Sequence, residues 1–324
     1  MSTSLYRANR PRAAGMSRAR TLVFAYSEMG ARCLEILLEH GVDVVAVYTH
    51  RDDPHELRWF RCVAGIANAR AVPVRRPARL SDPRVVDEIR ELGPDLILSF
   101  YYRRLIPPSI LSLPRLGAFN MHGSLLPLYR GRAPVNWAIL RGESRTGATL
   151  HHMVEEPDAG DIVDQESVPI EVEDTAMTVQ ERVNDAGCAI LIRQLPALLR
   201  GSAPRRPQDE RRATSFGRRT PEDGRIDWRC GAEQIANLVR AVAPPFPGAF
   251  TEIEGRRLFV WRARPARGQG LPGTVLSERP LVVACGRDAL EIVDWMWCSP
   301  EAKAPLRVGE CFRQQEPPIE EMRT

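Results

Sequence analysis

The sequence FNMHGSLLPLYRGRAPVNW occupies residues 119–137, where an apolar segment runs into a loop rich in Gly, Pro and Arg. Residues 117–121 are predicted to form a buried strand. Asn120 and His122 are two positions apart, so on a strand their side chains project to the same side. Open α/β sheets bind their ligands at the carboxyl ends of their strands. The end of this strand is therefore the first candidate site.

The residue types at this position favour acid–base chemistry. The imidazole of His122 can take or give a proton near neutral pH, and the amide of Asn120 can donate to a developing oxyanion. Asp158 follows in the segment MVEEPDAG at residues 153–160. A carboxylate near the imidazole would orient it and favour its protonated form. Taken singly, these residues also fit a buried structural histidine and an ordinary turn.

Strands and helices alternate around this stretch. Apolar β-rich runs at residues 21–26, 42–48 and 95–100 are separated by segments with helical spacing of apolar residues near 33–41, 59–67 and 83–92. This alternation predicts βαβ units, and hence an α/β domain with a Rossmann-like parallel sheet covered on both faces. The first strand-to-helix turn contains only Gly30, whereas a dinucleotide loop needs three glycines, so NAD binding is disfavoured.

The composition changes after a longer helix predicted at residues 178–200. Residues 201–212 are polar and contain Pro, and short β-rich pieces separated by Gly or Pro follow a helix at 232–242. A small, mainly antiparallel, OB-like β-barrel is predicted there. The predicted organisation is a disordered basic leader (1–20), a catalytic domain (21–204), a linker (205–219), a C-terminal barrel-like domain (220–300) and a loosely packed tail (301–324).

The overall composition is that of a globular protein. The chain has 324 residues, about twice the typical length of a single domain. Its 45 Lys and Arg residues against 41 Asp and Glu residues give a net charge of +4. No apolar run is long enough to span a membrane. Residues 1–20 contain five Arg and no apolar core, which excludes a secretory signal and leaves a leader, a transit peptide or a misplaced start.

The cysteines and histidines do not predict a disulfide framework or a metal site. Seven cysteines without a C-x-x-C pair indicate buried free thiols and a cytoplasmic protein. The six histidines contain no H-E-x-x-H pattern, so no metal is predicted. His151 and His152 are neighbours on a predicted strand and are interpreted as structural or pocket-lining residues.

Several motifs together resemble the folate-dependent formyltransferase superfamily. They are FAYSEMG, SFYYRRLI, GAFNMHGSLLPLYRGRAPVNW, TLHHMVEEPDAG, FGRRTPEDG and AVAPPFPGAF. Within the superfamily they are most similar to the formyltransferase domain of the bifunctional polymyxin-resistance enzymes, which act on UDP-4-amino-4-deoxy-L-arabinose. The resemblance extends from about residue 21 to about residue 293.

The resemblance implies an activity and a set of site residues. Asn120, His122 and Asp158 would be catalytic, and no metal would take part. The co-substrate 10-formyltetrahydrofolate would be bound by Arg104, Leu105, Ile106, Arg132, Val154, Glu155, Glu156 and Pro157. The formyl group would pass to the primary amine of a nucleotide-linked aminosugar, most closely UDP-4-amino-4-deoxy-L-arabinose, in lipid A modification and polymyxin resistance.

Other functions remain open at this stage. The same chemistry could serve methionyl-tRNA, another aminosugar or hydroxyornithine. A tRNA acceptor calls for a broad basic surface, which the small net charge disfavours. A non-catalytic nucleotide-binding module is disfavoured because Asn120, His122 and Asp158 are all present. Small-molecule partners are therefore predicted, and the oligomeric state is not.

Overall fold

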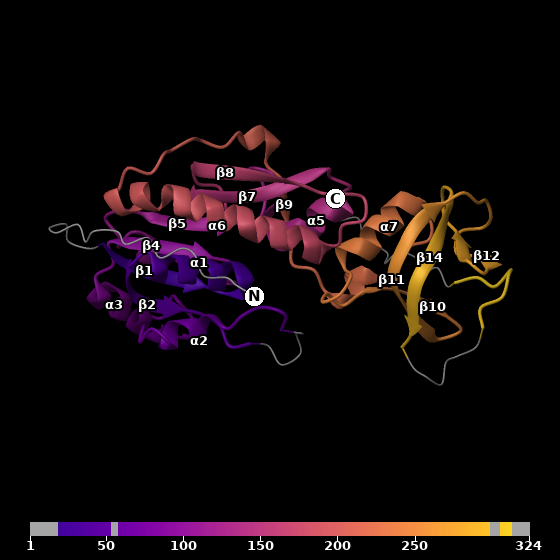
Figure 1. Ribbon diagram of the computed structural model, residues 1–324, viewed down its shortest axis with the longest axis horizontal. Helices are drawn as coiled ribbons and strands as arrows, with labels where there is room; N and C mark the ends of the chain where they lie inside the picture. Colours follow the sequence, from indigo (N-terminus) through magenta and orange to yellow (C-terminus); the bar gives the residue numbers. More distant parts are fainter. Residues whose placement is uncertain (1–18, 53–57, 299–304, 313–324) are drawn as a thin grey trace, which may run out of the picture.

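The computed structural model describes residues 19–52, 58–298 and 305–312. Two lobes lie side by side along the long axis of the molecule, an α/β lobe from the N-terminal part and a smaller β-rich lobe from the C-terminal part (Figure 1). The predicted fold class, a Rossmann-like α/β domain followed by a small, mainly antiparallel β domain, is thereby confirmed. The predicted leader up to residue 18 and part of the predicted tail lie outside the described residues.

Seven strands form the N-terminal sheet in the order β3-β2-β1-β4-β5-β7-β8. Their bounds are β1 Arg20–Ala25, β2 Asp43–Tyr48, β3 Val74–Arg75, β4 Leu96–Phe100, β5 Ala118–His122, β7 Arg145–His152 and β8 Ile162–Pro169. Strands β1 to β5 are parallel to one another, whereas β7 runs antiparallel to both β5 and β8. The predicted parallel arrangement therefore stops at β5, and β7 and β8 form an antiparallel pair that is joined by a loop without a crossover helix.

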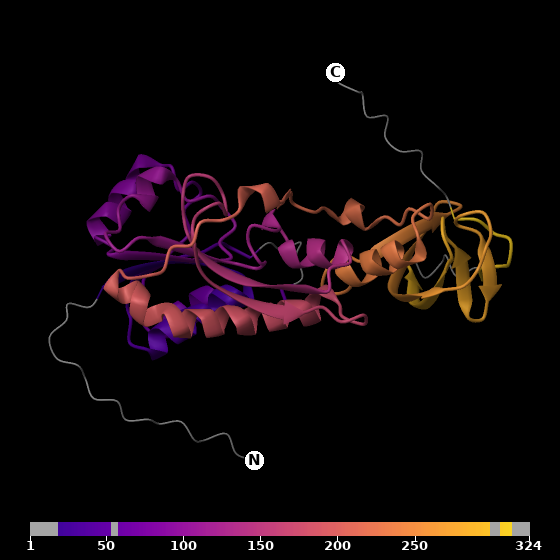
Figure 2. The same cartoon turned by 90° about the horizontal axis from the view of Figure 1, so that it is seen from above.

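Helices cover both faces of this sheet. Leu22 and Phe24 of β1 belong to the core beneath α3 (Pro83–Leu92) and α4 (Pro108–Leu111), whereas Val23 and Ala25 face the core of α1 (Ser27–Glu39) and α6 (Ala176–Arg200). The alternation follows from the two-residue period of a strand. Figure 2 shows the long α6 running along one side of the lobe. The short α2 (Val63–Asn68) packs against α1.

The same alternation positions the two polar residues of β5. Met121 is buried in the core of α1 and α6, and Ala118 belongs to the core on the opposite face. Asn120 and His122 therefore lie on the face of Ala118, away from α1 and α6. Sequence reasoning predicted this shared face from the spacing of the two residues.

The segment predicted as a linker folds back onto the N-terminal lobe. Arg206 forms a β-bridge with Ile162, a single 3-10 turn follows at Glu210–Arg212, and β9 (Ser215–Phe216) pairs with β6 (Arg130–Gly131). The buried guanidinium of Arg130 donates to Gln208 and to Glu210. These contacts give the segment an ordered path that its polar composition did not predict.

The C-terminal lobe has a core of its own. Five antiparallel strands form a sheet in the order β10-β11-β14-β13-β12, with α7 (Ala232–Ala241) packed against β11. The strands are β10 Ala249–Ile253, β11 Arg256–Ala266, β12 Val275–Glu278, β13 Leu281–Ala284 and β14 Ala289–Trp297. Trp228 is fully buried and stacks on Phe312. Leu306 and Phe312 are buried in this core and Cys311 forms a β-bridge with Thr274, although a loose tail was expected there.

The two lobes meet through α5 (Pro134–Leu140) and α7. Asn136 of α5 donates from Nδ2 to the carbonyl oxygen of Ala241 at 2.7 Å. Arg240 of α7 donates to the carbonyl oxygens of Glu171 and Asp174, each at 3.2 Å. The helix that begins in the Gly/Pro/Arg loop therefore connects the candidate site to the second lobe.

The cysteines agree only in part with expectation. All seven are free, but only Cys33 and Cys285 are buried, while Cys62, Cys298 and Cys311 are exposed. Among the described residues, no helix combines the length and the apolar character that crossing a membrane requires.

Candidate active site

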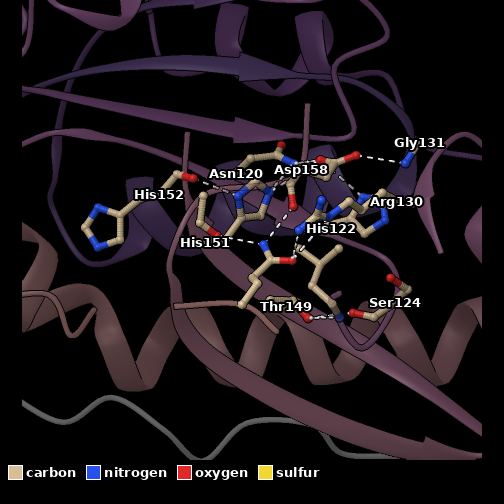
Figure 3. A network of polar contacts seen from close by, with 12 residues as sticks. Asn120, His122, Ser124, Arg130, Gly131, Thr149, His151, His152 and Asp158 are labelled. Carbon is tan, nitrogen blue, oxygen red and sulfur yellow. Dashed lines mark hydrogen bonds and ion pairs between the residues drawn. The ribbon is translucent and has the colours of Figure 1, made fainter. Parts of the chain in front are cut away.

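Asn120, His122 and Asp158 come together at the end of β5, although Asp158 lies on the loop between β7 and β8 (Figure 3). Asp158 Oδ1 lies 3.5 Å from Asn120 Nδ2 and 3.6 Å from His122 Nδ1. The structure thus assembles the three residues whose combination singled out this site in the sequence.

The ring of His122 is buried and held by the backbone. Its Nε2 lies 2.8 Å from the carbonyl oxygen of Tyr129. Because a carbonyl oxygen only accepts hydrogen bonds, Nε2 carries the proton in this contact. The other ring nitrogen, Nδ1, faces the carboxylate of Asp158 and is the atom at which a proton can be taken up or released.

A network of side-chain contacts shapes the turn that presents the Tyr129 carbonyl. Ser124 Oγ donates to the carbonyl oxygen of Leu128 at 2.6 Å, and Thr149 Oγ1 of β7 donates to that of Ser124 at 2.6 Å. The backbone N–H of Leu126 donates to Thr149 Oγ1. The turn is therefore tied to β7, which is the strand that pairs with β5.

Asp158 is held as a carboxylate. Burial by itself raises its pKa, but the charge of His122, the contact with His151 and the backbone N–H of Gly131 outweigh burial and hold the pKa well below its ordinary value. The Gly131 N–H donates to Oδ2 at 2.9 Å. Asp158 also has a φ of +57°, a backbone conformation that few non-Gly residues adopt.

His151, interpreted from the sequence as a structural or pocket-lining residue, belongs to the same cluster. Its Nε2 lies 3.2 Å from Asn120 Nδ2 and 3.4 Å from Asp158 Oδ1, and its Nδ1 lies 2.8 Å from the carbonyl oxygen of His152. His152 points elsewhere, toward the carbonyl oxygen of Pro204. The pairing of His151 with Asn120 across β5 and β7 creates this contact, and only the register of the two strands could have revealed it.

The folded-back linker supports the Asp158 loop from behind. Gln208 Nε2 donates to the carbonyl oxygens of Asp158 and Gly160, both at 2.7 Å. Gly131, whose N–H binds Asp158, pairs with Phe216 of the same segment. At Gly131 φ is +96°, and a Cβ would lie 2.4 Å from the carbonyl oxygen of Phe216, so only glycine fits there without displacement.

The residues predicted to bind the folate lie on three segments, which follow β4, β6 and β7. Arg104, Leu105 and Ile106 follow β4, Arg132 follows β6, and Val154, Glu155, Glu156 and Pro157 precede Asp158. Leu105 is 72% exposed and Val154 is 46% exposed. Their neighbours Ile106 and Met153 pack against the same core on the α3 and α4 side, so the segments after β4 and β7 lie over one face of the sheet. The two arginines donate to backbone carbonyls, Arg104 to Pro77 and Arg132 to Arg103.

Unusual backbone conformations gather near the site. Positive φ angles occur at the non-glycine residues Ser27, Tyr101, Tyr129 and Ala133, each within two residues of a strand end, and at Asp158 on the loop between β7 and β8. Such conformations cluster at functional sites, where the surrounding structure enforces them. In the described part of the chain, no group of three His, Cys, Asp or Glu residues is arranged to hold a metal ion.

Two family models match the chain. Residues 20–195 match the model described as formyl transferase, and residues 218–315 match the model of the formyl transferase C-terminal domain. The first match alone covers more than half of the chain. The chain therefore belongs to the formyl transferase family, and the predicted formyltransferase activity is confirmed at that level.

Solved structures with a similar fold include sugar formyltransferases. WlaRD, described as a sugar 3N-formyl transferase with dTDP and 5-N-formyl-THF present, has a TM-score of 0.66 and 19% identity over 85% of this chain and 97% of its own. An N-formyltransferase from Helicobacter canadensis, in complex with folinic acid and dTDP-3-aminofucose, has a TM-score of 0.67 and 19% identity over 85% of this chain and 99% of its own. HypX from Aquifex aeolicus, in complex with tetrahydrofolic acid, has a TM-score of 0.60 and 22% identity over 88% of this chain and 45% of its own. At these identities the similarity concerns the fold.

Proposed function

We propose that the protein transfers the formyl group of 10-formyltetrahydrofolate to the amine of a nucleotide-linked aminosugar, specifically UDP-4-amino-4-deoxy-L-arabinose. The observation that carries the proposal is the mutual geometry of Asn120, His122 and Asp158 around one carboxylate oxygen. A primary amine attacks a formyl carbon only when it is neutral, and the reaction needs a proton acceptor and a donor to the formyl oxygen. The three residues supply both groups.

His122 is the proposed proton carrier. Its Nε2–H is engaged by the Tyr129 carbonyl, so Nδ1 is the atom that accepts the proton of the attacking amine. Protonation at Nδ1 places a positive charge 3.6 Å from the Asp158 carboxylate, which stabilises it. The same nitrogen can then return the proton to the leaving nitrogen.

Asn120 is the proposed donor to the formyl oxygen. Its Nδ2 carries two hydrogens. One is donated to His151 Nε2 at 3.2 Å, and the other makes only the long contact of 3.5 Å with Asp158 Oδ1, which the formyl oxygen can replace. A donor held in place before the reaction costs no reorganisation when negative charge develops on the oxygen. His151, which touches both Asn120 and Asp158, is a positioning residue in this scheme.

The loops that carry the predicted folate residues fit a flat, largely apolar ligand. The exposed side chains of Leu105 and Val154 leave apolar surface next to the cluster, and residues 154–157 are exposed. We assign binding of the formyl donor to Arg104, Leu105, Ile106, Arg132, Val154, Glu155, Glu156 and Pro157. When bound, 10-formyltetrahydrofolate supplies the formyl group.

The choice of acceptor rests on motifs and on similar structures. The resemblance of residues 119–137 and 216–224 favours a UDP-linked aminopentose. Two of the similar structures are named as sugar-type N-formyltransferases or contain an aminosugar nucleotide, which supports an aminosugar acceptor in general. A cytoplasmic location, consistent with seven free thiols, is part of the proposal.

Acceptor competition tests the proposal. The purified full chain is incubated with 10-formyltetrahydrofolate and, in separate reactions, UDP-4-amino-4-deoxy-L-arabinose, dTDP-linked 3-aminosugars, hydroxyornithine and methionyl-tRNA. Mass spectrometry is expected to detect a formylated product first and fastest with the UDP aminopentose. Formylation of another acceptor alone would overturn the acceptor assignment, and the absence of any formylated amine would overturn the proposed reaction.

A further inference from the structure

A cavity of about 210 Å³ lies at the carboxyl ends of β1 and β2. Its walls include Tyr26 and Ser27 after β1, His50 and Arg51 after β2, and Arg76 after β3. The direction of the strand order reverses at β1 and β4, and open α/β sheets bind ligands beside such a reversal. Drug-sized ligands fill pockets of roughly 300–1,000 Å³, so this cavity suits one part of a ligand.

The charges on the walls favour an anion. Arg61 is neutralised by Glu28 and Glu35, and Asp52 by Arg58. Arg51 and Arg76 are exposed and have no carboxylate partner among the described residues. Within the described part of the chain, the cavity therefore keeps two guanidinium groups whose donors have no acidic partner. Guanidinium groups bind phosphate oxygens through paired, charge-assisted hydrogen bonds.

His50 adds a hydrogen-bond donor to the cavity wall without adding a charge. Burial and the neighbouring Arg104, Arg103 and Arg132 lower its pKa to about 4, so its ring is neutral at physiological pH. Its Nε2 accepts the backbone N–H of Arg103 at 3.1 Å, which leaves the proton on Nδ1. The cavity wall thus contains a neutral hydrogen-bond donor that the arginines keep from becoming a cation.

A chain of contacts leads from the cavity to the candidate catalytic residues. The backbone N–H of Arg103 binds His50, and the carbonyl oxygen of Arg103 accepts from the guanidinium of Arg132. Arg132 follows Gly131, whose N–H binds Asp158. The pKa of Arg132 is lowered by burial and by the nearby Arg103 and Arg218. Positive charge is therefore concentrated between the cavity and Asp158.

We propose that Arg51 and Arg76 in this cavity, together with Arg132, form a subsite for the diphosphate of a nucleotide-linked acceptor. The inference rests on the proposed function and extends it to the group that anchors the acceptor. A diphosphate held there lies at the carboxyl ends of the strands, the same edge of the sheet at which β5 ends with His122. In this arrangement Arg132 binds the diphosphate of the acceptor, in addition to the contact with the folate that the sequence resemblance implied.

Nucleotide binding tests the subsite without turnover. Isothermal titration of the full chain with UDP, inorganic pyrophosphate and uridine is compared between the wild type and the double variant Arg51→Ala/Arg76→Ala. The Kd for UDP and pyrophosphate is expected to rise at least about tenfold, and any affinity for uridine to stay the same, because only the phosphates meet the arginines. An unchanged Kd for UDP would overturn the subsite.

A matched control and kinetics separate this subsite from the proposed function. Arg70→Ala/Arg79→Ala removes two exposed arginines of the same lobe that do not line the cavity, and it is expected to bind UDP as the wild type does. In the Arg51/Arg76 variant, KM for the aminosugar nucleotide should rise while kcat and KM for 10-formyltetrahydrofolate stay unchanged. A rise in KM for the folate would overturn the subsite. Loss of UDP affinity in a protein that formylates no aminosugar would support the subsite and overturn the proposed function.

Discussion

His122 and Tyr129 are joined by a hydrogen bond of 2.8 Å in which the ring Nε2–H donates to the backbone carbonyl oxygen. Tyr129 itself has a φ of +60°, so the turn is held in an uncommon conformation while it presents this carbonyl. The bond determines which ring nitrogen is occupied, and it directs Nδ1 toward Asp158. A single backbone contact thus fixes both the orientation and the tautomer of the imidazole.

The first prediction is that His122→Ala lowers kcat by about 10²–10⁴-fold, because a positioned proton carrier contributes that much. His40→Ala is the matched control, since His40 is exposed at the end of α1 and should leave kcat unchanged. Rates are measured with 10-formyltetrahydrofolate and the accepted amine, at equal melting temperature. Wild-type turnover in His122→Ala would remove His122 from the mechanism.

The second prediction concerns stability and pH. The pKa of Asp158 is lower in the folded protein than in the unfolded chain, so the unfolded state binds the proton more readily in acid. The stability that this carboxylate contributes is fully present above its unfolded pKa of about 3.9 and is lost as pH falls below that value. In Asp158→Asn this loss is absent.

The difference in free energy of unfolding between the wild type and Asp158→Asn should therefore be constant from about pH 5 to 7 and should shift against the wild type as pH falls below about 4. Urea denaturation at several pH values measures it. Asp161→Asn, on the same loop and partly exposed, is the control. A difference that does not change with pH would show that Asp158 has an ordinary pKa.

The third prediction is that Gly131→Ala lowers both stability and turnover. The new Cβ would meet the carbonyl oxygen of Phe216 at 2.4 Å, so β6 and β9 must separate, which disturbs the hydrogen bond from the Gly131 N–H to Asp158. Gly41→Ala is the control because Gly41 also has a positive φ, +69°, but no atom within 4 Å. Gly41→Ala should cost only the backbone term of about 1 kcal/mol and leave kcat unchanged.

Equal losses of stability in the two alanine variants, measured by urea denaturation, would show that the contact with Phe216 is not limiting. An unchanged kcat in Gly131→Ala would show that Asp158 does not depend on that N–H.

The parts of the fold that the sequence predicted well have local signals. The helix expected at residues 83–92 is α3, which begins at Pro83 after the N-cap Asp82 and ends before Gly93 in the left-handed conformation. The strands at 95–100 and 117–121 match β4 and β5 to within a residue or two because their apolar runs are buried. Asn120 and His122 could be assigned to one site because they lie at the end of the recognisable strand β5.

The parts that were missed depend on distant contacts. β8 carries Asp164, Gln165 and Glu166 along an edge of the sheet, so its sequence lacks a strand period. The segment 201–216 has a polar sequence, and its order comes from Arg130 and from pairing with β6. His151 joins the site only through cross-strand register and through a loop that returns to place Asp158 beside it.

The last prediction tests whether that returning segment supports catalysis. Phe216 stacks on Tyr129 with ring centroids 5.1 Å apart and on Trp137 at 4.9 Å, so it links β9 to the turn that orients His122 and to α5. Phe216→Ala should lower the free energy of unfolding by about 1–3 kcal/mol, less than for a fully buried Phe because the ring is half-exposed. It should also lower kcat, since Tyr129 loses the ring that holds it.

Phe259→Ala is the control, because Phe259 is half-buried and stacks on Trp261 at 5.2 Å in the other lobe. That variant should lose stability without losing kcat, and an equal fall of kcat in both variants would show that β9 has no specific role in the site.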